Sequence, residues 1–186
     1  PRMTSHLGQS GPIPLDCLDR RRSVPARQLG DPGPDDAQLA VMLQAASRVP
    51  DHGKRVPFRF LRIAGDARAA MGGFLAARKL EIDPDASDAA IEKERARFSF
   101  APVIVTVIAR QGFDEKIPAS ERLSTASCVC FALLQAAQAC GFGAQWLTGW
   151  AAYDEIVRGR LGLDEDEAVA GFIHIGTMAE PPLERP

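Results

Sequence analysis

The most apolar segment of the chain predicts a buried helix followed by a turn and a short strand. Between Cys128 and Ala137 only Gln135 is strongly polar, so this helix lacks the single polar face of a surface helix. It must therefore be buried all round, and 186 residues provide little interior in which to bury it. The pattern predicts an obligate homodimer, in which a second copy covers the helix.

Residues 141–143, Gly-Phe-Gly, follow this helix and are typical of a helix C-cap. A dinucleotide fingerprint would need a third glycine where Trp146 stands, and its glycines would open a helix instead of ending one. The strand predicted at residues 144–148 ends at Gly149. We expect this glycine-bounded backbone to be a place where a flat ligand can approach closely.

Helical and extended patterns alternate along the rest of the chain. Asp35 and Gln38 form a capping box, and residues 103–108 are continuously apolar and β-branched, which is typical of a central strand covered on both faces. Helices are predicted at 15–22, 35–48, 67–80, 87–98, 121–140 and 154–161, and strands at 58–63, 103–108, 144–148 and 169–175. Four strands interleaved with these helices predict an α+β or α/β fold, three layers deep, with helices on both faces of the sheet.

Length and charge narrow the class of protein. The chain is long enough for one domain, which we place at residues 15–186 after a flexible N-terminal tail at residues 1–14. The 22 basic and 24 acidic residues are scattered and the net charge is −2, so no basic face indicates a nucleic-acid partner. No apolar run approaches the roughly 20 residues that span a bilayer, and the start lacks the apolar core of a signal peptide.

The cysteines give no sign of a disulfide framework. Cys17, Cys128, Cys130 and Cys140 form no CxxC pair, and disulfides or zinc would need spacings that are absent. We interpret the four as small buried hydrophobic residues. Together with the absence of a membrane-spanning pattern, this predicts a cytoplasmic protein.

Two short segments carry the candidate chemistry. Residues 20–23, Arg-Arg-Arg-Ser, close the first predicted helix, either as a solvated basic end or as an anion clamp for a phosphate. Residues 50–55, Pro-Asp-His-Gly-Lys-Arg, gather ionisable side chains between a helix and a strand. This loop is either a solvated connection or part of a ligand site at the edge of the sheet.

Other kinds of catalytic site lack the residues that they need. A metal site would need more ligands than His52 and Asp51, because His6 lies in the predicted tail and His174 in a predicted buried strand. There is no GxSxG elbow, and no serine is expected beside a base. What remains is an anion clamp, a cationic loop and a glycine-bounded strand, which suit a protein whose bound cofactor carries the chemistry.

Four segments in a fixed order cover most of the chain. They are residues 20–23, 46–60, 140–149 (CGFGAQWLTG) and 171–181 (GFIHIGTMAEP). By their order and spacing the chain resembles the nitroreductase family of FMN-dependent homodimers, most closely its small bacterial members. The resemblance implies an α+β fold of three layers, α/β/α, with a central mixed sheet of four or five strands and the long apolar helix in a large dimer interface.

The resemblance also implies two FMN sites at that interface, each built from both subunits. The clamp would bind the FMN phosphate and the edge of the isoalloxazine, the loop after residue 46 would reach the same flavin from the other subunit, and the strand would lie along the ring with a backbone N–H near N5. The implied FMN-binding residues are Arg21, Arg22, Ser23, Arg48, His52, Trp146, Leu147, Thr148, Gly149 and Arg185. The implied contacts of the NAD(P)H donor are Ala136, Ala137, Gln138, Ala139, Cys140 and Gly141.

An FMN-dependent oxidoreductase of this type passes hydride from NAD(P)H through FMN N5 to a small electron-poor acceptor, such as a nitroaromatic or a quinone, in a ping-pong cycle. The flavin carries this chemistry, so no protein acid or base need be essential. Two alternatives from other classes are a flavin-binding or flavin-delivery protein without turnover and a structural dimer without a cofactor.

One departure from the family pattern concerns charge. Close relatives carry arginine and serine after the tryptophan, where Leu147 and Thr148 stand here. Reduced FMN is negative around N1 and the C2 carbonyl, so the absence of that arginine removes one positive charge beside the flavin. The loop that holds Asp51 and Lys54 also differs from that of many relatives.

Overall fold

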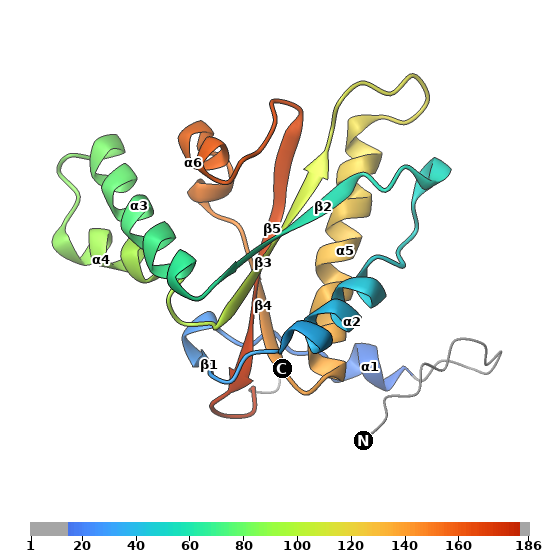
Figure 1. Cartoon of the computed structure of the whole chain (residues 1–186), viewed down its shortest axis with the longest axis horizontal. Helices are drawn as coiled ribbons and strands as arrows, with labels where there is room; N and C mark the ends of the chain where they lie inside the picture. Colours follow the sequence, from blue (N-terminus) through green and yellow to red (C-terminus); the bar gives the residue numbers. More distant parts are fainter. Residues whose placement is uncertain (1–14, 183–186) are drawn as a thin grey trace.

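The computed structural model describes residues 15–182 as a five-stranded sheet with helices on both faces (Figure 1). The helices are α1 (Asp16–Asp19), α2 (Asp36–Ala46), α3 (Asp66–Ile82), α4 (Asp88–Ala96), α5 (Ala119–Ala139) and α6 (Glu155–Arg160), with the 3-10 turns η1 (Ala26–Gln28), η2 (His52–Lys54) and η3 (Trp150–Ala152). The strands are β1 (Leu29–Gly30), β2 (Phe58–Ala64), β3 (Val103–Arg110), β4 (Gly143–Leu147) and β5 (Glu167–Met178). The tail predicted at residues 1–14 and the predicted phosphate ligand Arg185 lie outside the described residues.

Strand β5 organises the sheet. It pairs with β3 over most of its length, with β4 along its other edge and with β1 at its end, while β2 adds to the far edge of β3. The α+β class is confirmed, but every one of these pairings is antiparallel, so the expectation of a mixed sheet is wrong. Burial on both faces gives β3 its unbroken apolar run, and that burial depends on covering helices, whichever way the neighbouring strands run.

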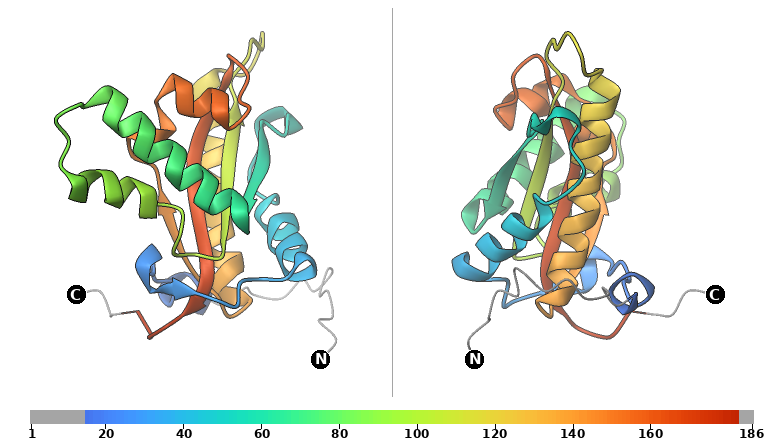
Figure 2. Two further views of the ribbon diagram at one scale, coloured as in Figure 1. Left: turned by 60° about the vertical axis from the view of Figure 1, so that its left-hand side comes forward. Right: turned by 90° about the vertical axis from the view of Figure 1, so that its right-hand side faces the viewer.

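Two hydrophobic layers hold the helices to the sheet. Buried side chains of α2 and α5 pack with Val105, Val107 and Ile173 on one face, and those of α3, η3 and α6 pack with Ile104 and Phe172 on the other. Figure 2 shows α5 and α3 on opposite sides of the strands. The predicted three-layer architecture is therefore confirmed. None of the helices described between residues 15 and 182 is long and apolar enough to cross a membrane.

Helix α5 has two different faces within one chain. Val129, Leu133 and Ala137 are buried against the sheet, whereas Cys128 is exposed and Phe131 keeps 42% of its surface accessible. The described residues of a single chain therefore cover only the inward face of the helix that the sequence predicts to be buried all round. On the outward face Cys128 and Phe131 remain exposed.

The cysteines agree only in part with the prediction of buried residues. Cys130 is buried, and burial raises the pKa of its thiol to about 12. Cys140 is half-buried, which also raises its pKa. Cys17 and Cys128 are exposed, so the prediction is wrong for these two within one chain, because Cys128 lies on the outward face of α5 and Cys17 on the short, exposed α1.

Most element boundaries agree with the sequence patterns to within a few residues, and one difference has a specific cause. The first helix is predicted at 15–22, whereas α1 ends at Asp19. The backbone N–H of Arg22 donates to Oε1 of Gln138 at 3.2 Å, which draws the chain off a helical path and onto the end of α5. The capping box is confirmed, since Asp35 and Gln38 exchange hydrogen bonds of 2.7 and 3.0 Å.

Candidate functional site

The segment after α1 is fastened to the end of α5 by one side chain. Nε2 of Gln138 donates to the carbonyl of Arg20 at 2.9 Å, while Oε1 of the same amide accepts from the backbone N–H of Arg22. Two hydrogen bonds from one amide fix the backbone on both sides of Arg21. The predicted anion clamp is therefore a positioned element of the fold.

Within this segment the three predicted phosphate ligands have different surroundings. Nη1 of Arg21 donates to Oγ of Ser23 at 3.3 Å, and its guanidinium lies 5.9 Å from the centroid of the Phe131 ring. The Arg22 guanidinium instead folds back on its own turn, where it donates to the carbonyls of Asp19 and Arg21. Arg21 and Ser23 thus form the convergent pair, and Arg22 acts on the local backbone.

Beyond Ser23 the chain runs beside β4. The N–H of Val24 donates to the carbonyl of Ala144 at 3.0 Å, and the N–H of Ala26 donates to Oε1 of Gln145 at 2.6 Å. These contacts bring two segments that are far apart in the sequence together along one edge. The segment that follows the clamp therefore lies beside the glycine-bounded strand, and a shared site remains a prediction.

A cleft of about 330 Å³ opens where these two segments meet the end of α4. Its lining combines apolar surfaces with positive charge and contains no carboxylate: Pro25, Ala26, Arg27, Lys93, Arg97, Phe100, Gln145 and Leu147. A volume of this size lies at the lower end of the range for small-molecule sites, which are typically apolar with a few placed polar groups. The cleft can accept a flat, partly anionic organic molecule.

Arg97 is held in this cleft by a buried carboxylate. Its Nε and Nη2 donate to the two carboxylate oxygens of Glu94 at 2.6 and 2.9 Å, and Glu94 is only 6% exposed. Burial alone would raise the pKa of Glu94, but the hydrogen bonds and charge of Arg97, with smaller contributions from Trp150 and Lys93, hold that pKa below its ordinary value. The pair is thus a charged fork with one fixed orientation.

The other end of β4 requires a residue without a side chain. Gly149 has a φ of +79°, and a Cβ there would lie 3.1 Å from Nη1 of Arg97. Thr148 beside it is half-buried. The backbone of these two residues therefore lies next to the cationic cleft, where the sequence predicts contact with a ligand.

Along β4 the side chains alternate between two environments. Leu147 and Gln145 face the cleft, whereas Trp146 packs with the core that underlies α5 and donates its indole N–H to the carbonyl of Ala170 at 3.1 Å. A Cβ on Gly171 would lie 2.1 Å from the indole nitrogen, so glycine is needed there to admit the ring. The structure thus places the Trp146 side chain on the opposite face of the strand from the cleft.

The residues expected to contact the NAD(P)H donor form the last turn of α5 and its cap. Gly141 has a φ of +86°, and the N–H of Phe142 returns to the carbonyl of Ala137 at 2.9 Å, which confirms the predicted C-cap. Gln138 is committed to the clamp, Ala137 is buried, Cys140 and Ala136 are half-buried, and Ala139 is exposed. Their contact with a donor remains a prediction.

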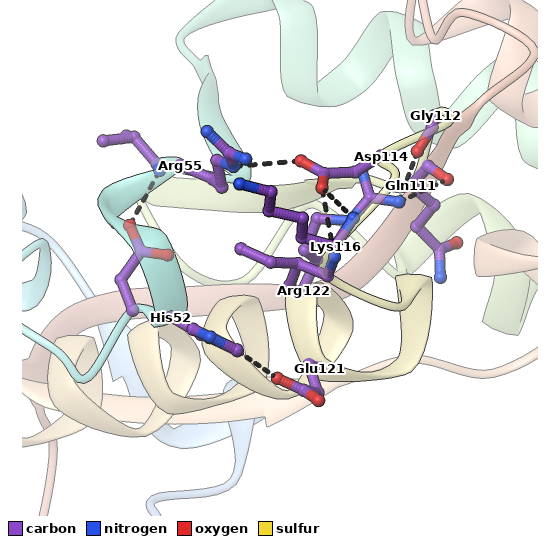
Figure 3. Close-up of polar contacts among 11 residues, drawn as sticks. His52, Arg55, Gln111, Gly112, Asp114, Lys116, Glu121 and Arg122 are labelled. Atoms are coloured by element: carbon purple, nitrogen blue, oxygen red, sulfur yellow. Dashed lines mark hydrogen bonds and ion pairs between the residues drawn. The ribbon is translucent and has the colours of Figure 1, made fainter.

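The remaining predicted residues are Arg48, which follows α2, and His52, which lies at the other end of α5. Nδ1 of His52 lies 2.8 Å from Oε2 of Glu121 in the first turn of that helix (Figure 3), whereas Gln138 is in its last turn. At a rise of ~1.5 Å per residue these two positions on α5 are roughly 25 Å apart. One chain therefore does not bring its loop residues and its clamp together.

The loop around His52 has a costly backbone conformation. Lys54 and Val56 have φ values of +51° and +48°, which are unfavourable for any residue with a Cβ and most of all for a β-branched one. Asp51 accepts from the Val56 N–H at 2.7 Å, and Arg55 pairs with Asp114 at 2.9 Å (Figure 3). Such conformations persist where surrounding contacts enforce them, often at ligand-binding sites.

The loop before α5 also fixes Asp114, the partner of Arg55 in the strained loop around His52. The backbone N–H groups of Lys116 and Ile117, together with Arg55, hold the pKa of Asp114 below its ordinary value despite the opposing effect of desolvation. Arg122 donates to the carbonyl of Gln111 at 3.0 Å (Figure 3). Asp114 is therefore charged at neutral pH and can hold the Arg55 side of the loop.

Sequence reasoning misses the three cations that line the cleft. Lys93 and Arg97 belong to a stretch of mixed charge that is indistinguishable from solvated helix surface, and Arg27 is a lone cation in a predicted linker. The feature that distinguishes Arg97 is the burial of its partner Glu94, and a sequence of alternating charges does not reveal which carboxylate is buried.

Comparison with known proteins assigns the chain to a family. The family model described as the nitroreductase family matches residues 18–177, from within α1 to the last residues of β5. The chain belongs to the nitroreductase family. This agrees with the resemblance seen in its sequence segments.

Individual nitroreductase relatives extend this finding. The chain is 35% identical over 163 residues to the Escherichia coli K12 protein named "Putative NAD(P)H nitroreductase YdjA", covering 88% of this chain and 87% of that protein. The Bacillus cereus crystal structure of a nitroreductase-like family protein matches with a TM-score of 0.78 at 19% identity, over 96% of this chain and 92% of the other. A Bacteroides fragilis nitroreductase crystallised with bound FMN matches with a TM-score of 0.67 at 21% identity, over 92% and 91%.

Proposed function

We propose that this protein is an FMN-dependent NAD(P)H oxidoreductase that acts as a homodimer on small electron-poor acceptors, such as nitroaromatics or quinones. The observation that carries the proposal is the cationic cleft beside Gly149, with the segment that follows the clamp running along β4. The FMN bound by the Bacteroides fragilis relative and the NAD(P)H in the name of the Escherichia coli relative support it.

The residues present fit FMN in their chemistry. Arg21 and Ser23 offer a guanidinium and a hydroxyl that converge, which suits a phosphate. Apolar Pro25 and Leu147 offer surface to a flat ring, and the basic lining suits a ring that becomes negative when reduced. The assignment of Arg185 as a second ligand of the phosphate remains a prediction.

When bound, FMN supplies hydride exchange at N5, and the chain has to hold it and leave one face of it open. Gln138 keeps the clamp in register with β4 through its two backbone hydrogen bonds. The positive φ of Gly149 turns the chain at the end of β4, where we expect a backbone N–H to face N5. No acid or base of the protein is assigned to the reaction.

The donor and the acceptor would use the same open face in turn, as a ping-pong cycle requires. We assign the NAD(P)H contacts to residues 136–141 at the end of α5, beside the clamp that Gln138 holds. An acceptor would then occupy the place that the oxidised nicotinamide leaves.

Two subunits are needed to complete each proposed site. A two-fold axis perpendicular to α5 would run the helices of two copies antiparallel. The first turn of one α5, with Glu121 and His52, would then lie beside the last turn of the other, with Gln138 and Arg21. The exposed apolar face that carries Cys128 and Phe131 is the surface available for this contact.

Absorbance of the purified protein tests the proposal. We expect a yellow protein with the bands of oxidised flavin, bleached by NADH or NADPH under anaerobic conditions and recoloured by a quinone or a nitroaromatic. Colourless protein that takes up no added FMN would contradict flavin binding. A flavin that neither nucleotide bleaches would contradict the enzymatic function and favour a carrier of FMN.

A further inference from the structure

The Glu94–Arg97 pair is the most specific arrangement of charge in the cleft. The fork uses Nε and Nη2 of Arg97, and within the residues that the structure describes Nη1 makes no hydrogen bond. That unused corner is the one nearest Gly149, at the end of β4. The pair therefore presents a donor and a positive charge in one fixed direction, along the lining that Leu147 shares.

The surroundings of the pair explain why its orientation is fixed. Glu94 is buried and Arg97 is one-fifth exposed at its side chain. Phe98, the next residue, is fully buried and stacks on His174 of β5 with 5.7 Å between ring centroids. The end of α4 is thus locked to the sheet, so Arg97 cannot withdraw from the cleft without breaking a buried ion pair.

We propose that Arg97 contacts the pyrimidine edge of the flavin and stabilises its reduced form, and that Glu94 is the positioning residue that aims Arg97 and moderates its charge. This inference rests on the proposed function. In this chain the positive charge beside the ring then comes from α4, while β4 carries the uncharged Leu147 at the position nearest the cleft. Lys93 and Arg27 also line the cleft and add to the same positive field.

Substitutions of Arg97 and Glu94 should have opposite effects on how easily the flavin is reduced. Loss of the Arg97 guanidinium removes positive charge from beside the reduced ring, so the flavin should become harder to reduce. Replacement of Glu94 by glutamine keeps the size and the hydrogen-bond acceptor but removes a negative charge, so the flavin should become easier to reduce. A purely structural role would give no such opposition in sign.

The test measures the midpoint potential of protein-bound FMN in the wild type and in Arg97→Ala, Arg97→Lys and Glu94→Gln. At a fixed potential we expect the ratio of reduced to oxidised flavin to fall about tenfold in Arg97→Ala, which corresponds to about 30 mV for a two-electron couple. Arg97→Lys should recover part of this change, and Glu94→Gln should raise the ratio.

The chain provides a matched control two residues earlier on α4. Glu92 and Arg95 form the same i,i+3 pair at 3.1 Å, but both side chains are more than half exposed and neither lines the cleft. Glu92→Gln and Arg95→Ala should leave the potential unchanged. If these variants shift it as much as the cleft variants do, the effect is general electrostatics and the inference fails.

Each remaining outcome of this experiment also supports or overturns the inference. Shifts of the same sign in Arg97→Ala and Glu94→Gln, or no shift in either, would overturn the inference while leaving the proposed function intact. If Arg97→Ala retains too little flavin to measure, Glu94→Gln decides alone, and an unchanged or lowered ratio overturns the inference. A wild-type protein that binds no FMN would instead contradict the proposed function, and the inference with it.

Discussion

At the scale of single residues, Arg21 and Ser23 are the two clamp residues whose side chains converge. We expect Arg21→Ala to weaken FMN binding by about 1.5–3 kcal/mol, the usual contribution of a charge-assisted hydrogen bond, or roughly 10- to 150-fold. Equilibrium dialysis against FMN measures this. The control is Arg20→Ala, since the Arg20 side chain is exposed and pairs with exposed Asp16 at 3.3 Å. Equal affinity in the two variants would contradict the assignment.

A second prediction at this scale concerns His174, which is 1% exposed on β5. Burial, with a smaller effect from the charge of Arg97, lowers the pKa of its imidazole from 6.5 to about 4. The unfolded chain therefore binds an extra proton between these two values, so stability falls as pH drops from 6.5 and the loss is complete below about 4. For one such group the loss amounts to about 3 kcal/mol.

His174→Leu removes this titration, and urea unfolding at several pH values between 7 and 4 measures it. The free energy of unfolding of the wild type should fall more steeply over this window than that of the variant. Carboxylates with lowered pKa, such as Glu167 beside Arg59, contribute to both proteins equally. Parallel pH profiles would therefore show that His174 is not the group responsible.

The role of a residue was predictable where the local sequence around it is unusual for this chain. The run of Arg20 to Ser23 stands out in a chain of balanced charge, and the structure brings Arg21 and Ser23 together as predicted. Arg97 was not predictable, because its role depends on Glu94 being buried, and burial is set by the packing of α4 on α3. Gln138 was predicted to contact the NAD(P)H donor. Its hydrogen bonds to the clamp were not predictable, because they join positions more than a hundred residues apart in the sequence.

At the scale of elements, the link between α5 and the clamp can be broken separately from the clamp itself. Gln138→Ala removes two hydrogen bonds to backbone, each worth about 1 kcal/mol. We expect FMN binding to weaken several-fold although no group proposed to contact the phosphate is lost. Thermal unfolding and flavin titration measure the two effects. Gln135→Ala, on the same helix one turn earlier, should change neither, and a matching loss there would contradict the special role of Gln138.

The local sequence patterns predicted the order of helices α1 to α6 and strands β2 to β5, and most of their boundaries, because periodicity and capping are local properties. Strand direction is not local. Continuous apolar character in β3 and β5 shows that both faces are covered, but only the pairing shows that their neighbours run antiparallel. Likewise, the premature end of α1 follows from a contact with α5 that no pattern within residues 15–22 contains.

At the scale of the whole molecule, the outward face of α5 is the surface that we propose for the contact between two copies. Phe131→Asp places a charge at the centre of the surface proposed to meet a second copy, and burial of a phenylalanine contributes about 1.5–3 kcal/mol per side. We expect sedimentation to show monomers and the flavin to be lost with them. The control is Phe113→Asp, because Phe113 is 93% exposed in the loop before α5. A Phe131→Asp protein that stays dimeric would contradict this interface.

His52 and the clamp are held at opposite ends of α5, by Glu121 and Gln138, which are roughly 25 Å apart along the helix. This separation has a genetic consequence. Each pocket of the proposed assembly would take its loop from one gene copy and its arginine from the other. A strain or a mixture expressing His52→Ala and Arg21→Ala subunits together would then form hybrids with one doubly defective pocket and one wild-type pocket. Random pairing would restore roughly a quarter of the normal pockets from two polypeptides that are each defective alone.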